Sequence, residues 1–269
     1  MSADSGAPNA LVTGISSLVS GATGFLGGYL LARLRKKGFQ VRALARKTSD
    51  VAGLVRAGCD IYEGDIMDRQ SLLRAMVGQQ LVFHTAGKVS DRGSRREFWQ
   101  ANVDGTANVI AACREAGVKR LIHLSSLTVL GLPRSGARVD EQTPPAAALR
   151  DPYSASKLAG ERLVREAHGS SGLETVVIRP GVIWGPGDTT IMPRLIALLR
   201  RRRLVFIGRG DTRLRVAAAP PALSRYGVRL VACDSRYDIG KARRELAYRP
   251  TLTFRQGMEF LFAAATTEP

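Results

Sequence analysis

The feature that most constrains the fold is a set of three evenly spaced glycines, Gly21, Gly24 and Gly27. A short apolar run precedes them, and we expect the first strand at residues 15–20. Leucines that recur every three to four residues follow them up to Gly38 and predict a helix. A glycine turn between strand and helix lets the backbone approach a bound phosphate, and the amides that begin the helix favour an anion. We therefore expect a parallel α/β sheet that binds a phosphate-bearing ligand beside its first strand.

Strand and helix patterns alternate along the first two thirds of the chain, which is typical of right-handed parallel crossover units. Further strands are expected at residues 40–45, 59–63, 80–85, 119–125 and 174–179, and helices near Leu54 and over 71–76, 102–116 and 153–167. Residues 131–150 are rich in proline and glycine and are expected to form a loop. The sequence predicts a Rossmann-type α/β fold with a doubly wound parallel sheet.

The chain is expected to divide into a dinucleotide-binding domain over residues 1–180 and a small, shortened substrate-binding region over 181–269. In the second region the pattern is weaker. Helices are expected at 192–203 and 238–246, an extended stretch at 204–208 and a short amphipathic helix at 254–264.

The net charge of +17 raises the question of a nucleic-acid partner. The basic residues are spread along the whole chain, so we expect no nucleic-acid partner and instead an attraction to phosphate-bearing small molecules. Three distant cysteines favour neither a disulfide framework nor a metal site, and they indicate a reducing compartment. Because no secretory signal and no run of roughly 18 apolar residues is found, we expect a cytoplasmic protein without a membrane span.

Tyr153 and Lys157 are four residues apart in an expected helix, so both side chains leave from one face. A nearby ammonium stabilises a phenolate and lowers the pKa of the phenol. Tyr153 can then exchange a proton with a carbonyl or alcohol oxygen, and Ser126, after the fifth strand, can hold that oxygen. The sequence predicts an acid-base site that interconverts a carbonyl and an alcohol.

Several further motifs accompany this pair. They are Asp65-Ile66, Thr85-Ala86-Gly87, Asn102-Val103-Asp104-Gly105-Thr106, Leu124-Ser125-Ser126 and the segment Arg179-Pro180-Gly181-Val182-Ile183-Trp184-Gly185-Pro186-Gly187-Asp188. With the glycine turn and 153–157, they make the chain from residue 17 to about 257 resemble the extended short-chain dehydrogenase/reductases, or NAD-dependent epimerase/dehydratase family.

The resemblance implies a catalytic trio of Ser126, Tyr153 and Lys157. It also implies a coenzyme site formed by Gly21, Thr23, Gly24, Phe25, Leu26, Gly27, Arg46, Asp65, Ile66, Thr85, Ala86, Gly87, Asn102, Tyr153, Lys157, Pro180, Val182 and Ile183. In that family, the residues at 65 and 66 flank the adenine and those at 180–183 border the nicotinamide. No metal is expected.

Arg46 bears on the choice of coenzyme because it stands 19 positions after Gly27. An acidic residue there would bind the ribose hydroxyls of NAD, whereas arginine can pair with the extra phosphate of NADP. We expect NADP, with NAD left open.

The segment 179–188 resembles the hydroxysteroid-dehydrogenase and 3-oxoacyl-reductase branch. We therefore expect an NAD(P)-dependent oxidoreductase acting on an apolar small-molecule substrate. A nucleotide-sugar epimerase with bound NAD and a non-catalytic NADP-binding protein are the alternatives. A dehydratase is disfavoured because Ser126-Leu127-Thr128 lacks an acidic pair. A block of the family pattern is missing around residues 216–222. This leaves three alternatives for the substrate half: it is open, completed by a second subunit in a homodimer, or non-functional.

Overall fold

The computed structural model describes residues 15–90, 93–131, 138–188 and 236–252, together with Gln256 and Glu259. These residues fall into two compact units that interleave along the chain. The first takes its described residues from 1–87, 100–124 and 159–178, and the second from 88–99, 125–158 and 179–269. Several expected features lie outside the described residues. They are the helix at 192–203, the extended stretch at 204–208, the region of the missing block around 216–222 and most of the helix at 254–264. The division at residue 180 stays a prediction.

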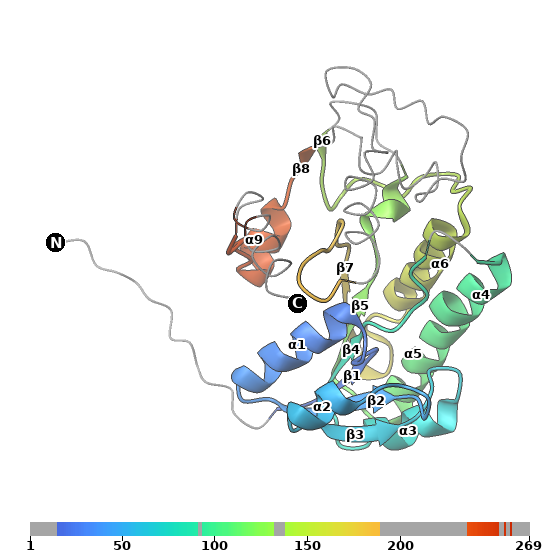
Figure 1. Cartoon of the computed structure of the whole chain (residues 1–269). Coiled ribbons are helices and arrows are strands. Elements are labelled where there is room, and N and C mark those ends of the chain that lie inside the picture. Colours follow the sequence, from blue (N-terminus) through green and yellow to red (C-terminus); the bar gives the residue numbers. More distant parts are fainter. Residues whose placement is uncertain are drawn as a thin grey trace, which may run out of the picture. The chain divides into compact units, whose positions relative to one another are not determined.

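The first unit is built on a six-stranded sheet with the order β3-β2-β1-β4-β5-β7 (Figure 1). All neighbouring strands run parallel. The strands are β1 (Ser16–Ser20), β2 (Gln40–Ala45), β3 (Asp60–Glu63), β4 (Leu81–His84), β5 (Arg120–Leu124) and β7 (Glu174–Ile178). Each predicted strand is confirmed to within one residue at either end. The strand order reverses direction at β1, which confirms the doubly wound topology.

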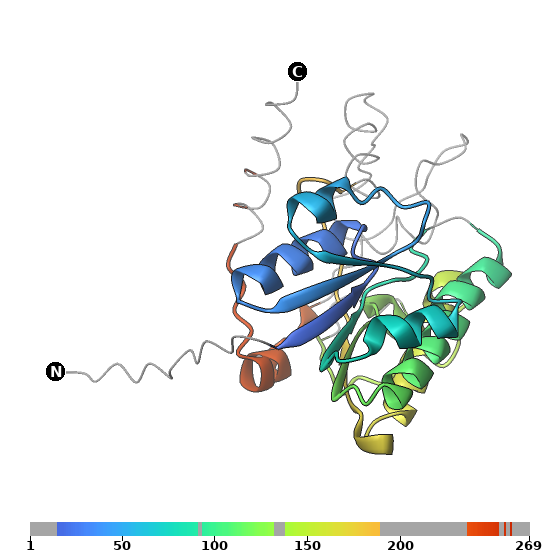
Figure 2. The ribbon, with the colours of Figure 1, turned by 90° about the horizontal axis from the view of Figure 1, so that it is seen from below.

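Helices cover both faces of this sheet (Figure 2). Leu18 and Val19 of β1 point to opposite faces because side chains alternate along a strand, and each joins a different buried cluster. The helices α1 (Phe25–Lys36) and α2 (Ala52–Arg56) pack on the Val19 side. The helices α3 (Arg69–Met76) and α5 (Gly105–Glu115) pack on the Leu18 side. A short turn, η3 (Ser170–Gly172), leads into β7.

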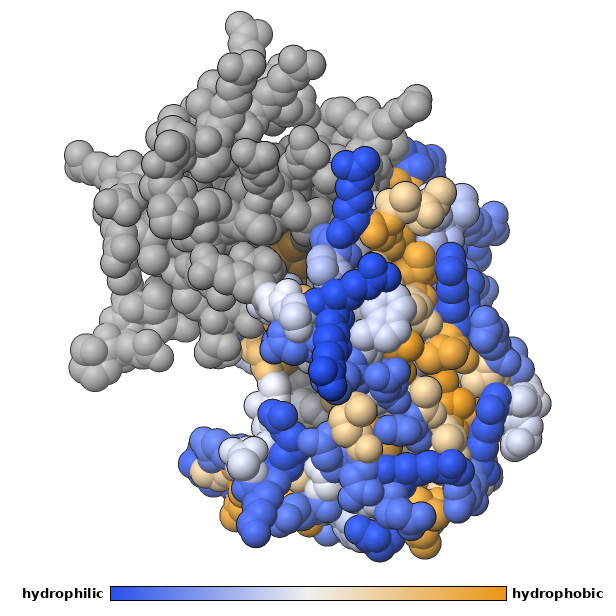
Figure 3. All heavy atoms as spheres, turned by 90° about the vertical axis from the view of Figure 1, so that its right-hand side faces the viewer, coloured by the Kyte–Doolittle hydropathy of each residue, from blue (hydrophilic) through white to orange (hydrophobic). Residues whose placement is uncertain are grey.

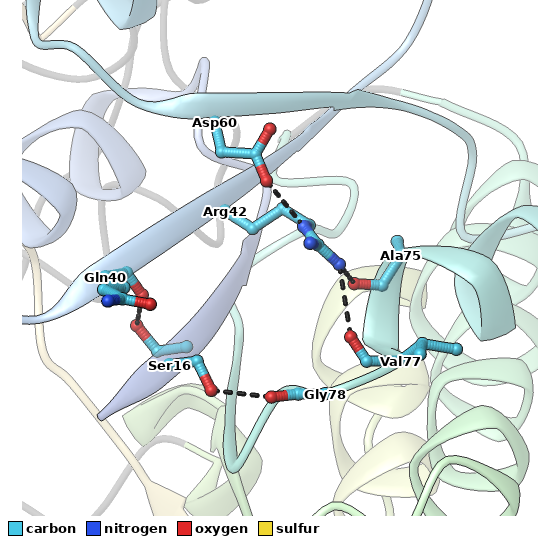
Figure 4. A network of polar contacts seen from close by, with 8 residues as sticks. Ser16, Gln40, Arg42, Asp60, Ala75, Val77 and Gly78 are labelled. Atoms are coloured by element: carbon cyan, nitrogen blue, oxygen red, sulfur yellow. Dashed lines mark hydrogen bonds and ion pairs between the residues drawn. The ribbon is translucent and has the colours of Figure 1, made fainter. Parts of the chain in front are cut away.

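A polar network at the amino-terminal side of the sheet joins β2, β3 and the end of α3 (Figure 4). The Arg42 guanidinium donates to the Ala75 carbonyl at 2.8 Å and the Val77 carbonyl at 3.4 Å, and it donates to Asp60 Oδ2 at 2.8 Å. The last carbonyls of a helix have no partner inside the helix, so Arg42 supplies one from a neighbouring strand.

The prediction of a helix over 102–116 is wrong for its first turn, which is not α-helical. Residues Gln100–Asp104 form a π-helix, η1, and the α-helix begins only at Gly105. The cause is close packing: a Cβ on Gly160 would lie 2.3 Å from the Asn102 carbonyl oxygen, and Thr106 Oγ1 donates to the same oxygen at 2.8 Å. The wider turn presents that carbonyl to these two partners instead of to the regular helical ladder.

The second unit contains α4 (Arg95–Trp99), η2 (Leu127–Leu130), β6 (Arg138–Val139), β8 (Arg236–Tyr237) and α9 (Gly240–Leu246). The helix α6 (Pro152–Glu166) contributes residues 152–158 to this unit and its later residues to the first. The prediction of loop for all of 131–150 is wrong at β6, which pairs parallel with β8. The expected helices at 153–167 and 238–246 are confirmed as α6 and α9, with slightly different ends.

The helix α4, which was not among the helices predicted from the sequence, begins with a capping box. The Ser94 amide donates to Glu97 Oε2 at 2.7 Å, and the Glu97 amide donates to Ser94 Oγ at 3.3 Å. Among the described helices, none has the length and apolar character that a membrane span needs. Figure 3 shows hydrophobic side chains scattered among hydrophilic ones over the described residues of one face.

Candidate active site

The glycine turn after β1 is closed by three backbone contacts that exclude side chains. Gly21 has a φ of +75°, and a Cβ there would lie 2.7 Å from the Ala86 amide nitrogen. A Cβ on Gly27 would lie 2.1 Å from the Gly21 carbonyl oxygen, so α1 rests directly on the turn. Gly24 donates its amide to that same oxygen at 3.0 Å and is the N-cap of α1. Gly21 and Gly27 are therefore required by a close approach of backbone to backbone, whereas a Cβ on Gly24 would lie 3.2 Å from the Gly21 carbonyl oxygen.

The carboxyl ends of four neighbouring strands bring most of the predicted coenzyme residues of this unit to one edge of the sheet. Ser20 pairs in register with His84 and with Leu44, and Ala45 pairs with Glu63. Gly21, Arg46, Asp65 and Thr85 follow these strand ends directly. Thr85 Oγ1 donates to the Ser20 carbonyl at 2.6 Å, which ties β4 to the glycine turn.

The individual side chains at this edge differ in exposure. Arg46 and Lys47 are exposed, and so is Gly87. Thr23 is exposed in the turn, Phe25 stacks edge-on against Tyr29, and Leu26 is half-buried.

Asp65 and Ile66 are fixed by local contacts. Asp65 Oδ1 accepts from the Met67 amide at 2.9 Å, and the Ile66 side chain occupies the space that a Cβ on Gly105 would need. Asn108 donates its side-chain amide to the Ile66 carbonyl at 3.0 Å. The segment after β3 is thereby held against α5.

In the second unit, Ser126 and Tyr153 are hydrogen-bonded through their hydroxyl groups. Ser126 is the N-cap of η2 and is 7% exposed, and Tyr153 lies in the first turn of α6. Asp151 Oδ1 accepts from the Ser154 amide at 2.7 Å and so caps this helix. The ring of Phe98 packs edge-on against Tyr153, with centroids 6.3 Å apart.

The pKa of the Tyr153 phenol is raised, which differs from the lowering expected beside a lysine. Burial is the main cause, because it penalises the charged phenolate, and the Asp151 carboxylate adds to the rise. The hydrogen bond from Ser126 acts in the opposite direction. The effect of burial on the pKa of Tyr153 therefore outweighs that of the Ser126 hydrogen bond.

Lys157 follows Tyr153 by one turn of α6 and is 3% exposed. Burial lowers the pKa of its ammonium to about 8. The charged and neutral forms of Lys157 are therefore both accessible near neutral pH, which is the range in which a proton-exchanging site is most effective.

The segment after β7 is attached to the turn that carries Ser126. The Leu127 amide donates to the Pro180 carbonyl at 2.9 Å, and Gly181 packs against the Leu127 side chain. Val182 is 37% exposed, and Ile183 is half-buried. The three predicted residues Pro180, Val182 and Ile183 thus lie in the same unit as Ser126 and Tyr153.

Two contributors were missed by the sequence reasoning. Phe98 comes from α4, whose capping pattern Ser94-Arg95-Arg96-Glu97 was a readable signal. Thr128 hydrogen-bonds Ser126 within a turn whose shape the sequence does not reveal. His84 is fully buried and is hydrogen-bonded to Ser20 Oγ and Thr106 Oγ1. No cluster of three or more potential metal-binding side chains occurs among the described residues.

Comparison with known proteins agrees with this arrangement. The model of the NAD dependent epimerase/dehydratase family matches residues 17–215. The chain belongs to this family. Among members of the NAD dependent epimerase/dehydratase family, it is similar to the 2-alkyl-3-oxoalkanoate reductase of Stenotrophomonas maltophilia (strain K279a). The two are 40% identical over 200 residues, which cover 73% of this chain and 59% of the relative.

A second relative, the 3beta-hydroxysteroid-dehydrogenase/decarboxylase isoform 1 of Arabidopsis thaliana, is 36% identical over 203 residues, covering 71% of this chain and 46% of that protein. The chain thus spans only about half the length of these curated relatives. Among solved structures, MoeE5 in complex with UDP-glucuronic acid and NAD superposes with a TM-score of 0.74, covering 93% of this chain and 99% of that one at 23% identity. This likeness shows the family's fold.

Proposed function

We propose that this protein is an NADP-dependent oxidoreductase that interconverts a hydroxyl and a carbonyl group on an apolar, steroid-like or 3-oxoacyl-like substrate. The observation that carries the proposal is the hydrogen-bonded pair of Ser126 and Tyr153 hydroxyls with buried Lys157 one helical turn away. This is a set of groups suited to delivering one proton to one oxygen atom.

The residues at the sheet edge fit a dinucleotide. The glycine turn leaves backbone amides accessible where a Cβ at Gly21 or Gly27 would clash, so a pyrophosphate can approach the start of α1. Asp65 and Ile66 would flank the adenine, and Thr85, Ala86, Gly87 and Asn102 would line the coenzyme. When bound, the coenzyme supplies or accepts the hydride.

NADP is preferred in this proposal because of Arg46 and Lys47. Both follow β2 directly, both are exposed, and neither position offers a carboxylate for the ribose hydroxyls of NAD. A guanidinium can bind a phosphate through two parallel hydrogen bonds, which favours the coenzyme with the extra phosphate.

In the reducing direction, Tyr153 gives its proton to the substrate carbonyl oxygen as the carbonyl carbon gains a hydride. Ser126 donates a hydrogen bond to the same oxygen and stabilises the negative charge that develops there. Charged Lys157 favours the phenolate that Tyr153 becomes, and it would bind the coenzyme ribose. In the oxidising direction, the same groups act in reverse and Tyr153 accepts the hydroxyl proton.

The substrate class is taken from the relatives. The names of the two curated relatives describe a 3-oxoalkanoate reductase and a 3-hydroxysteroid dehydrogenase, and both reactions act at an oxygen on an otherwise apolar skeleton. We propose the same class for this chain, with a nucleotide sugar as the alternative.

The test is incubation of the pure protein with NADPH and either an ester of 2-methyl-3-oxobutanoate or a 3-keto steroid, and separately with UDP-glucose and NAD. Loss of nicotinamide absorbance with the ketones supports the proposal. Net isomerisation of UDP-glucose supports an epimerase, and NADPH binding without any turnover supports a non-catalytic protein. Tyr153→Phe is expected to abolish turnover while NADPH affinity stays within about threefold, and Tyr248→Phe, on an exposed tyrosine after α9, is the matched control.

A further inference from the structure

The hydroxyl of Ser126 has a well-defined set of partners. It accepts from the Thr128 amide at 3.2 Å and from Thr128 Oγ1 at 3.0 Å. It is also hydrogen-bonded to Tyr153. Both Ser126 and Thr128 are buried, with 7% and 5% of their surfaces exposed. Little water can therefore replace either partner.

The two bonds that Thr128 donates determine where the Ser126 proton can go. A serine hydroxyl has one proton to donate and two lone pairs that accept. Thr128 fills both acceptor positions, one with its N–H and one with its O–H. The single proton of Ser126 is then left for Tyr153 and for any substrate oxygen placed beside it.

We propose that Thr128 is a positioning residue: by donating its hydroxyl proton to Ser126 Oγ, it directs the Ser126 proton toward Tyr153 and the substrate oxygen. This inference rests on the proposed function for its kinetic consequence. The hydrogen-bond geometry on which it is built belongs to the protein alone.

The threonine side chain suits this role because it is β-branched and has few accessible rotamers. The residue is buried, and its hydroxyl donates to Ser126 Oγ. Valine has nearly the same shape but no hydroxyl, so Thr128→Val leaves the backbone N–H bond and removes only the O–H bond. One lone pair of Ser126 is then open, and its proton has a second orientation to adopt.

The charged groups around Tyr153 make the effect measurable. The Asp151 carboxylate on the preceding cap raises the pKa of the phenol, as does burial, and the Ser126 hydrogen bond is what lowers it. Lys157 follows on the same helix, and Phe98 from α4 contributes an uncharged ring. When the Ser126 hydrogen bond is weaker, burial and the Asp151 carboxylate therefore raise the pKa of Tyr153 further.

The first experiment is a double-mutant cycle on turnover with NADPH and the 2-methyl-3-oxobutanoate ester. Thr128→Val is expected to lower kcat about tenfold with little change in KM, and Thr128→Ser, which keeps the hydroxyl, to recover to within about threefold of the original. In a Ser126→Ala background, Thr128→Val is expected to have no further effect. Thr143→Val, on an exposed turn at 140–143, controls for loss of a threonine hydroxyl elsewhere.

Equal kcat values for Thr128→Val and the unmodified protein would overturn the proposal, as would full additivity with Ser126→Ala, because an unrelated structural role adds independently. If Thr128→Val does not fold, Thr128→Ala removes the same hydroxyl and is judged by the same outcomes.

The second experiment needs no turnover and so separates this inference from the proposed function. The chain has six tyrosines, and the ultraviolet titration difference between each protein and its Tyr153→Phe version isolates one of them. Thr128→Val is expected to shift the titration of Tyr153 to higher pH, and Thr128→Ser to leave it in place. An unchanged Tyr153 titration in Thr128→Val refutes the positioning role even if the protein proves to be an active reductase. A shifted titration in a protein without ketone turnover upholds it and refutes only the proposed function.

Discussion

Replacement of Lys157 by methionine tests the buried ammonium through the pH dependence of stability. Burial lowers the pKa of Lys157 from 10.5 to about 8. Because one pKa unit corresponds to about 1.4 kcal/mol, this difference corresponds to about 3 kcal/mol. Below pH 8 the lysine is charged in both states, and folding must bury the charge. Between about pH 8 and 10.5 the unfolded chain binds the proton and the folded protein does not, so the free energy of unfolding rises with pH.

The assay is urea denaturation of the unmodified protein and of Lys157→Met at several pH values across that window. Cys113, whose pKa burial raises to about 12, gives an opposite slope above its ordinary value of 9.0, but it is present in both proteins and cancels in their difference. The free energy of unfolding of the unmodified protein relative to that of Lys157→Met should rise by about 3 kcal/mol from the lower to the upper end of this pH window. A difference that stays constant within about 0.5 kcal/mol would refute the view that Lys157 is buried as a costly cation.

Three further changes test other parts of the account. Gly27→Ala places a Cβ 2.1 Å from the Gly21 carbonyl oxygen and should weaken NADPH binding at least about 100-fold in a fluorescence titration. Gly28→Ala, whose Cβ would lie 3.9 Å from the nearest atom, should leave NADPH binding intact and stabilise α1 by up to about 1 kcal/mol. Equal effects of Gly27→Ala and Gly28→Ala on NADPH binding would contradict the glycine-turn argument. Arg46→Asp should lower the ratio of NADPH to NADH affinity by about tenfold or more, and an unchanged ratio would reject the role of Arg46. Arg42→Ala removes the donor for the carbonyls at the end of α3 and should lower the free energy of unfolding in urea by about 2 kcal/mol. Asp60→Asn, on the exposed partner of Arg42, should lower it by less than about 1 kcal/mol. Equal losses in the two variants would show that the ion pair, rather than the helix-end bonds, provides the stability.

The sheet could be predicted from the sequence because its information is local. Each strand carries a short group of apolar residues, and a polar or glycine residue follows each group. The glycine turn could be predicted for the same reason, since Gly24 and Gly27 both lie close to the Gly21 carbonyl oxygen within one strand-turn-helix unit.

Features that depend on distant partners could not be predicted. The π-helix at Gln100–Asp104 arises where Gly160, more than fifty residues later, packs on the Asn102 carbonyl. The strand β6 exists only because β8 pairs with it from about a hundred residues away.

The candidate site shows the same division. The spacing of Tyr153 and Lys157 correctly indicated one helix face, but the direction of the Tyr153 pKa depends on burial by neighbours such as Phe98, which no local pattern gives. The roles predicted for the site residues stay predictions until they are tested.

The measurement that tests the central claim most directly is the fate of a deuterium atom placed at the reactive carbon of the NADPH nicotinamide. With the 2-methyl-3-oxobutanoate ester as substrate, the account predicts that the label appears on the carbinol carbon of the product, on one face only, and that Tyr153→Phe yields no labelled product. A product that carries no deuterium whichever face of the nicotinamide carbon is labelled, or label transfer at an undiminished rate in Tyr153→Phe, would contradict it.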